Sequence, residues 1–316
     1  MFKSLRVQII QPCMARCKWC GTWKKNDVFR LLQEKGISNS IHDFYLSAVK
    51  KFRPESINVS GGEPLLLPGI GKYMSSLAEF VDRRIYLFTS YQFPQRRREN
   101  LDLADMPWDK ITLTHTTAGF DKDKWLDITE GFPFDQYIRN IKELSKSPWR
   151  KHVKFIINHE NIDDELKRFS KLIAPDDSFG ISLKLMNNQA GNFGKKEIKR
   201  TKDWVLGQID KRTVDPKGKL KVDTKLFGEE AIKGFLKGDK GKSCPYRSSP
   251  LELRFALFKQ AKKGVKLKYR FCPHFPSNKY FVYKIGKDNI DDIENEFNNK
   301  SWHKWCSKCR LKLYVN

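Results

Sequence analysis

Short apolar segments alternate with segments of helical periodicity over the first two thirds of the chain. Six segments are rich in β-branched or aromatic residues and bounded by turn residues, which predicts six strands. These lie at residues 5–10, 56–60, 84–90, 110–115, 152–159 and 180–186. Helical spacing follows at residues 41–52, 70–81, 134–144 and 162–173, with Asn39 and Ser40 as candidate caps of the first helix.

Strands separated by helical crossovers indicate an α/β fold with a parallel sheet, either a barrel or a doubly wound sheet. In such folds, functional side chains gather at the carboxyl ends of the strands. The sequence changes near residue 190, after which it becomes basic and glycine-containing, with a strand-like alternation at residues 265–271. We therefore predict one domain at residues 1–190 and a second, basic region at residues 191–316.

The charge balance of the chain is strongly positive, with 61 Lys and Arg against 37 Asp and Glu and a formal net charge of +24. This charge indicates an anionic partner, such as nucleic acid or a nucleotide, about as strongly as it indicates a lysine-rich composition bias. No apolar run approaches the ~20 residues of a membrane helix, and the start of the chain does not resemble a signal peptide. We expect a cytoplasmic protein without a membrane partner, whose thiols stay reduced.

Seven cysteines divide into two groups, one at each end of the chain. Cys13, Cys17 and Cys20 follow the first predicted strand with C-x3-C-x2-C spacing. An odd count in a reducing compartment favours metal ligands over disulfides. Three thiolates from one short loop can hold three irons of a [4Fe–4S] cluster and leave the fourth iron open. Zinc, which usually has four ligands, is the alternative.

A second motif, Ser60-Gly61-Gly62-Glu63-Pro64, follows the second predicted strand. Paired glycines let the backbone approach a ligand closely, and a carboxylate beside them can receive an ammonium group. By itself this motif is more typical of a turn before a helix. Because it lies at the same end of the predicted sheet as the cysteine loop, it becomes a candidate second half of one site.

With these two motifs, CMARCKWC and SGGEP, the sequence resembles the radical S-adenosylmethionine (SAM) superfamily over about residues 5–190. The resemblance implies a partial (β/α)6 TIM-like barrel whose open iron chelates the amino and carboxylate groups of SAM. It also implies reductive cleavage of SAM to a 5′-deoxyadenosyl radical, which takes a hydrogen atom from the substrate. An electron donor such as flavodoxin or ferredoxin would supply the reducing electron.

The resemblance also implies roles for individual residues in binding SAM. Gly61, Gly62 and Glu63, followed by Pro64, would face the methionyl ammonium, and Trp19 would lie near the adenine. Hydroxyls at the ends of the third and fourth strands would face the SAM carboxylate or ribose, and an amide after the fifth would line the same pocket. The residues expected there are Thr89, Ser90, Thr114 and Asn158.

The second cysteine group, Cys244, Cys272, Cys306 and Cys309, ends in C-x2-C and supplies four ligands. It is similar to the Twitch domain, a short form of the SPASM extension that holds an auxiliary [4Fe–4S] cluster. Such a cluster would accept an electron from the substrate radical or position the substrate. A zinc site remains the alternative, because His274 and His303 lie close to these cysteines.

Three substrate classes follow from these observations. The net charge favours a nucleotide or a base in nucleic acid, whereas the Twitch-like spacing favours dehydrogenation of an amino sugar or similar metabolite. Radical maturation of a peptide is weakened, because the first strand is expected to begin about five residues after Met1 and no leader-binding domain would precede it. A non-enzymatic alternative is a zinc-stabilised nucleic-acid-binding protein.

Overall fold

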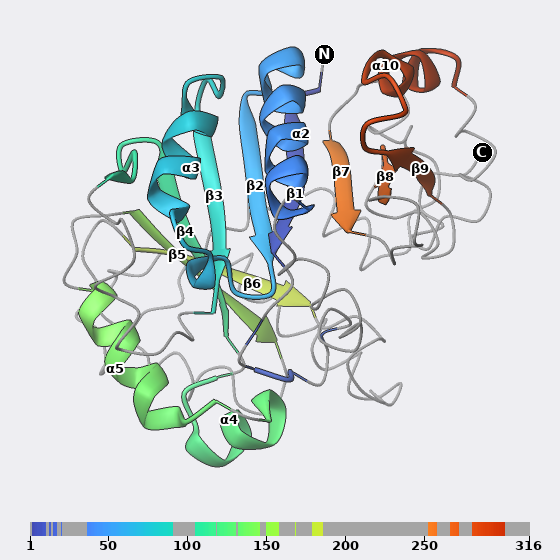
Figure 1. Cartoon of the computed structure of the whole chain (residues 1–316). Coiled ribbons are helices and arrows are strands. Elements are labelled where there is room, and N and C mark those ends of the chain that lie inside the picture. Colours follow the sequence, from blue (N-terminus) through green and yellow to red (C-terminus); the bar gives the residue numbers. More distant parts are fainter. Residues whose placement is uncertain are drawn as a thin grey trace, which may run out of the picture.

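The computed structural model describes 14 separate stretches of the chain, and all structural statements below concern these residues. These stretches are residues 2–10, 13, 15–17, 20, 37–90, 105–117, 119–130, 132–145, 150–157, 168, 179–185, 252–257, 266–271 and 280–300. Nine strands form one sheet in the order β6-β5-β4-β3-β2-β1-β7-β8-β9 (Figure 1). Their bounds are β1 Ser4–Ile10, β2 Ser56–Gly61, β3 Arg84–Thr89, β4 Ile111–Thr117, β5 Arg150–Ile157, β6 Phe179–Leu185, β7 Glu252–Leu257, β8 Lys266–Arg270 and β9 Phe281–Lys284.

The six predicted strands are all present and pair in parallel, each with the next in sequence. Helices α2 (Ile37–Phe52) and α3 (Ile70–Ala78) lie over β1, β2 and β3 (Figure 1). Helices α4 (Lys122–Thr129) and α5 (Phe134–Ser145) follow β4. The predicted α/β fold with a mainly parallel sheet is therefore confirmed.

The two faces of the first four strands differ in character. One face is apolar and fully buried against α2 and α3, through alternate residues such as Leu5, Val59 and Leu87. Because side chains alternate along a strand, the residues between them point to the opposite face, which we call the polar face. The polar face includes Arg6, Gln8, Asn58, Ser60, Tyr86, Phe88, Thr112 and Thr114. Side chains of this face contact one another: Asn58 donates to Ser4 Oγ (3.0 Å), and the Arg6 guanidinium lies 5.1 Å from the centre of the Phe88 ring.

The described C-terminal strands continue the same sheet. β7 pairs in parallel with β1, and β8 and β9 then add antiparallel strands. At this junction Phe2 packs edge-on against Phe52 of α2 and Phe297 of α10 (Asp291–Asn298) and stacks on Phe271 (5.9 Å between ring centres). Residues 191–251 lie outside the described part, so a boundary near residue 190 stays a prediction.

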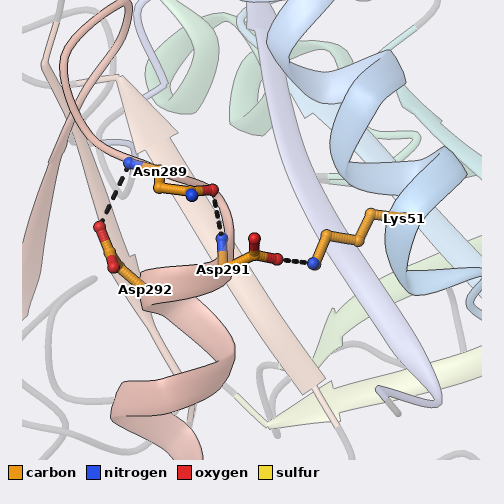
Figure 2. Close-up of polar contacts among 4 residues, drawn as sticks. All are labelled: Lys51, Asn289, Asp291 and Asp292. Atoms are coloured by element: carbon orange, nitrogen blue, oxygen red, sulfur yellow. Dashed lines mark hydrogen bonds and ion pairs between the residues drawn. The ribbon is translucent and has the colours of Figure 1, made fainter.

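Helix α10 begins with a reciprocal cap that the close-up in Figure 2 displays. The Asn289 side chain accepts a hydrogen bond from Asp291 N (3.0 Å), and Asp292 accepts one from Asn289 N (3.2 Å). This reciprocal pair resembles a capping box but lies one residue ahead of Ile290, which flanks the helix and makes no side-chain cap itself; it gives two backbone N–H groups at the entry to the helix side-chain acceptors. Asp291 also forms an ion pair with Lys51 of α2, which links α10 to the body of the protein.

Several element boundaries differ from the sequence-based expectations. α2 begins at Ile37, so Asn39 and Ser40 lie inside the helix and the prediction that they cap it is wrong. α3 ends at Ala78, because Phe80 and Val81 bond back to Leu77 and Ala78 in a turn. The expected strand at 265–271 is confirmed as β8, whereas α4, β7, β9 and α10 were not predicted. The expected helix at residues 162–173 lies outside the described residues, apart from Arg168.

No helix in the described part of the chain combines the length and the apolar character needed to cross a membrane.

Candidate functional site

The cysteine loop and the SGGEP motif meet at the carboxyl edge of the sheet. The last residue of β1, Ile10, pairs with Gly61, after a register shift that follows Gln8. Ser60 Oγ donates to the Val7 carbonyl (3.1 Å) and ties the two strand ends together. The chain therefore enters the cysteine loop directly beside the paired glycines, as the sequence predicted.

The described residues of the cysteine loop are fixed by the core and by α4. Arg16 N donates to the Thr129 carbonyl at the end of α4 (2.7 Å), and Cys20 N donates to the Cys17 carbonyl (2.8 Å). Ala15 is buried, while Cys13 and Cys17 pack partly buried against the hydrophobic core. These contacts hold the loop against the sheet edge.

None of the three cysteines of this loop forms a disulfide, and all three are half-buried. Burial raises the pKa of the Cys17 thiol, and the neighbouring charges of Cys13 and Cys20 raise this pKa further. The three sulfurs are therefore close enough to interact electrostatically. Among the described residues, no three His, Cys, Asp or Glu side chains converge on a position for a single metal ion.

Glu63 is the most completely enclosed acidic group of the site, with no solvent exposure. Thr89 Oγ donates to Glu63 Oε1 (2.6 Å), as does Leu65 N (3.1 Å). Ser90 donates to Oε2 through both its backbone N and its hydroxyl, each at 2.7 Å. Burial raises the pKa of Glu63, and these four hydrogen bonds act in the opposite direction. The carboxylate thus joins the SGGEP motif to the end of β3.

The hydroxyls expected around SAM fall into two sets. The hydroxyls of Thr89 and Ser90 point to Glu63 and donate hydrogen bonds to its carboxylate. Thr114 lies beside Phe88 in the sheet register, on the polar face. Its Oγ is buried, and the described part of the chain gives it no hydrogen-bond partner. A buried hydroxyl without a partner is unfavourable unless a ligand or water completes it, so Thr114 suits a ligand-facing role.

Pro64 follows Glu63 as the first residue of a short 3-10 helix, η2 (Pro64–Leu66), and is buried beneath the site. Gly62 is half-buried between Gly61 and Glu63. Trp19 and Asn158 lie outside the described residues, as do all four predicted auxiliary ligands, Cys244, Cys272, Cys306 and Cys309.

Sequence reasoning missed a buried polar network behind the site. His115 Nδ1 lies 3.1 Å from the Thr89 carbonyl, and its Nε2 lies 2.6 Å from the Tyr137 hydroxyl. A carbonyl only accepts, so Nδ1 carries the proton and Tyr137 donates to Nε2. Thr117 Oγ also contacts the Tyr137 hydroxyl (3.0 Å), and Trp125 stacks on the Tyr137 ring (3.6 Å between centres). Both ring nitrogens of His115 have partners within the protein, which gives this residue a supporting role.

The network reaches both halves of the site. His115 Nδ1 donates to the carbonyl of Thr89, and the hydroxyl of the same Thr89 donates to Glu63. At the other end, Thr129 Oγ donates to the Trp125 carbonyl (2.7 Å), and the Thr129 carbonyl accepts from the cysteine loop at Arg16. The sequence offered only one hint of this connection, a histidine at the end of an apolar strand.

Comparison with known proteins agrees with this arrangement. A family model described as the radical SAM superfamily matches residues 7–173, which are 167 of the 316 residues. A search of curated proteins finds no match.

Three solved structures of SuiB from Streptococcus suis share the fold. The crystal structure of SuiB gives a TM-score of 0.59 at 13% identity, covering 93% of this chain and 65% of SuiB. SuiB bound to S-adenosylmethionine gives 0.62 at 12% identity, covering 100% and 72%. SuiB bound to its precursor peptide SuiA gives 0.61 at 12% identity, covering 100% and 71%. The chain thus spans about two thirds of the length of SuiB, and the likeness supports the predicted partial barrel.

Proposed function

The chain belongs to the radical SAM superfamily, and from this premise we propose that it is an enzyme that abstracts a hydrogen atom from its substrate with a SAM-derived radical. The observation that carries the proposal is the pairing of Ile10 with Gly61, which brings the cysteine loop and the SGGEP motif to one edge of the sheet.

The residues present fit a [4Fe–4S] cluster and SAM. Three half-buried cysteines that form no disulfide match the three cysteine ligands of a cluster with one open iron. Thr114 offers an unfilled hydrogen-bonding hydroxyl on the polar face, where a polar ligand would satisfy it. We assign Cys13, Cys17 and Cys20 as the cluster ligands. When bound, the cluster and SAM together would supply a 5′-deoxyadenosyl radical.

The chain's own residues would bind and orient this cofactor. Gly61 and Gly62 would leave room for the methionyl group at the sheet edge, with Glu63 beside them. The hydrogen bonds from Thr89 and Ser90 fix the Glu63 carboxylate, so this side chain would hold the backbone of the paired glycines in place at the end of β3. Trp19 and Asn158 stay proposed contacts to the same ligand.

We propose an anionic substrate, a nucleotide or a base in nucleic acid, because the chain carries a net charge of +24. A second candidate is a peptide, which the likeness to peptide-bound SuiB favours. A small amino sugar or similar metabolite is the third, on the Twitch-like cysteine spacing. We further propose that Cys244, Cys272, Cys306 and Cys309 bind an auxiliary [4Fe–4S] cluster that accepts an electron or positions the substrate.

The iron and sulfide content of the anaerobically reconstituted protein tests both cluster assignments. We expect about eight irons and eight sulfides per chain, four for each cluster. Replacing Cys13, Cys17 and Cys20 by alanine should remove about half, and replacing the four C-terminal cysteines should remove the other half. A colourless protein that binds zinc would instead support the zinc-stabilised nucleic-acid-binding alternative and end the enzyme proposal.

A further inference from the structure

One peptide group at the end of β3 is held from both sides. Its carbonyl, that of Thr89, accepts a hydrogen bond from His115 Nδ1 (3.1 Å), and its N–H, that of Ser90, donates to Glu63 Oε2 (2.7 Å). A trans peptide is planar, so its C=O and N–H point in opposite directions and turn together. Orienting the Thr89 carbonyl therefore also aims the Ser90 N–H at Glu63. We call this group the Thr89–Ser90 peptide.

The two residues that share this peptide provide most of the hydrogen bonds described for Glu63. Besides the Ser90 N–H, both hydroxyls donate to the carboxylate, that of Thr89 to Oε1 (2.6 Å) and that of Ser90 to Oε2 (2.7 Å). The remaining described donor is Leu65 N (3.1 Å). A fully buried carboxylate is strongly unfavourable without such donors. The position of the Thr89–Ser90 peptide therefore decides where the Glu63 side chain lies.

The His115 imidazole is itself fixed in orientation and in tautomer. The Tyr137 hydroxyl lies 2.6 Å from Nε2 and donates to it, which leaves the ring proton on Nδ1, facing the Thr89 carbonyl. Trp125 stacks on the Tyr137 ring at an interplanar angle of 15° and restricts its movement. His115, Tyr137 and Trp125 are all buried. The donor that faces the Thr89–Ser90 peptide is therefore set in advance by the residues behind it.

These hydrogen bonds form a chain in which every donor points the same way. Tyr137 donates to His115, His115 donates to the Thr89 carbonyl, and the Ser90 N–H of the same peptide donates to Glu63. Hydrogen bonds arranged head to tail in a buried site polarise and strengthen one another. Because the chain ends on the carboxylate that directly follows the paired glycines, the orientation of His115 affects the SGGEP turn.

We propose that His115 is a positioning residue of the site: it sets the plane of the Thr89–Ser90 peptide, and through Glu63 it holds the SGGEP turn in the shape that receives the methionyl end of SAM. His115 pairs in register with Thr89 and shares the helix-covered side of β4 with Leu113, opposite the polar face. It therefore acts through the protein and not by contact with SAM. The effect on SAM rests on the proposed function, whereas the control of the Ser90 N–H by His115 does not.

Hydrogen exchange of the reconstituted full chain, read at single residues by mass spectrometry, tests this control directly. In His115→Leu the Ser90 amide should exchange about tenfold faster than in the wild type, because the peptide loses the hydrogen bond from His115 and can turn away from Glu63. His115→Asn keeps a side-chain amide that can donate to the Thr89 carbonyl, so it should restore most of the protection. Tyr137→Phe removes only the hydroxyl that fixes the tautomer and should speed Ser90 exchange about threefold.

Leu113→Ala is the matched control for a general loss of stability. Leu113 precedes His115 by two residues on the same side of β4 and is also buried, but it pairs in register with Leu87 and not with Thr89. Its truncation leaves a cavity and destabilises the protein. Because opening at the end of β3 is a local event, Ser90 exchange in Leu113→Ala should stay within about twofold of the wild type.

The kinetics of SAM cleavage separate positioning from damage to the cluster. His115→Leu should raise the KM for SAM about fivefold or more and leave kcat and the iron content close to those of the wild type, because a displaced SGGEP turn weakens binding of SAM before the reaction. His115→Asn should recover most of the affinity, and Leu113→Ala should keep the KM of the wild type.

Unchanged Ser90 exchange in His115→Leu, or equal acceleration in Leu113→Ala, would overturn the inference and show that the sheet alone holds the peptide. If His115→Leu does not fold, the same comparison between Tyr137→Phe and Leu113→Ala decides. Faster Ser90 exchange in His115→Leu with an unchanged KM would reject the role of His115 in SAM binding. A wild-type protein that never cleaves SAM would contradict the proposed function, but Ser90 exchange would still test His115, so the two failures are distinguishable.

Discussion

Thr89, at the end of β3, and Thr114, in the middle of β4, have opposite relations to the protein around them. Thr89 donates to buried Glu63, whereas the buried Thr114 hydroxyl lacks a described partner. Thr89→Val should lower the free energy of unfolding by about 1–3 kcal/mol, because it leaves a buried carboxylate oxygen short of a donor. Thr114→Val should leave the free energy of unfolding unchanged or raise it slightly, because no hydrogen bond is lost.

Denaturant unfolding of both variants, together with SAM titration of the reconstituted proteins, checks these two predictions. We expect Thr114→Val to weaken SAM binding while its stability stays at the wild-type level. A Thr114→Val protein as destabilised as Thr89→Val would show that Thr114 has a structural partner and would remove it from the SAM site.

The buried His115 predicts a specific dependence of stability on pH. Burial lowers the pKa of His115 to about 4, from an ordinary value near 6.5. Between these two values the unfolded chain binds more protons, so folding stability falls as the pH is lowered from 6.5 toward 4, by about 3 kcal/mol from this group. The stability from neutral His115 is thus fully present above about pH 6.5.

His115→Asn removes this titration and keeps an amide that can donate to the Thr89 carbonyl. We expect the stability difference between wild type and variant to shrink as the pH falls from 7 to 4 in urea unfolding curves. A difference that stays constant over this range would contradict the assignment of His115 as a buried neutral group.

The sequence indicated which residues lie near the candidate site, but not which face of the sheet their side chains occupy. Thr89, Ser90 and Thr114 were all expected to face SAM, because each stands at the end of a predicted strand. Successive side chains alternate between faces, so one residue of register decides whether a hydroxyl meets Glu63 or the polar face. The hydrogen bonds of Glu63 depend on the three-dimensional approach of β3, which local sequence does not encode.

At the scale of elements, α10 offers a clean comparison of a cap with a surface ion pair. Asn289→Ala removes the side-chain acceptor at the start of α10 and should destabilise the protein by about 1 kcal/mol. Lys51→Met removes only the partly exposed ion pair with Asp291 and should cost about 0–1 kcal/mol. Thermal or denaturant unfolding measures both changes in stability. A larger loss of stability in Lys51→Met than in Asn289→Ala would show that the ion pair dominates the docking of α10.

The predictability of the elements follows their length and apolarity. β1 to β6 are apolar runs flanked by turn residues, and all six were found from the sequence. The helix α4 has only two buried residues, Trp125 and Thr129, so its periodicity is weak. The signal for α10 was present in Asn289, Asp292 and the spacing of Ile293 and Phe297, but it lies in a strongly polar segment. The four-residue β9 is too short to show a period.

At the scale of the whole molecule, the aromatic junction around Phe2 connects the start of the chain to the C-terminal elements. Phe2 is 3% exposed and contacts Phe52, Phe271 and Phe297. Phe2→Ala should lower the free energy of unfolding by about 3–5 kcal/mol, because it opens a cavity between α2, α10 and the end of β8.

Circular dichroism and tyrosine or tryptophan fluorescence should report this loss at one common midpoint, because β7 joins the same sheet as β1. Leu126→Ala, at an exposed position on α4, is a control that should change stability little. Two separate transitions in the wild-type protein would show instead that the C-terminal strands fold independently.

The sequence predicted a parallel core and a distinct basic C-terminal region, but it did not reveal that β7 extends the core sheet. That pairing joins residues about 250 positions apart, and no local pattern specifies such a partner. Arg6, Arg254 and Arg270 are likewise dispersed in the sequence and become neighbours only through the register of three strands. Charge composition indicated an anionic partner without locating it.

Reductive cleavage of SAM by the anaerobically reconstituted protein is the most direct test of the central claim. With dithionite as reductant, the wild-type protein should convert SAM to 5′-deoxyadenosine and methionine in equal amounts, and Cys17→Ala should form neither above background. Iron-loaded wild-type protein that leaves SAM intact, or a Cys17→Ala protein that cleaves it as well as the wild type, would contradict the proposal that the cysteine loop and SGGEP form a radical SAM site.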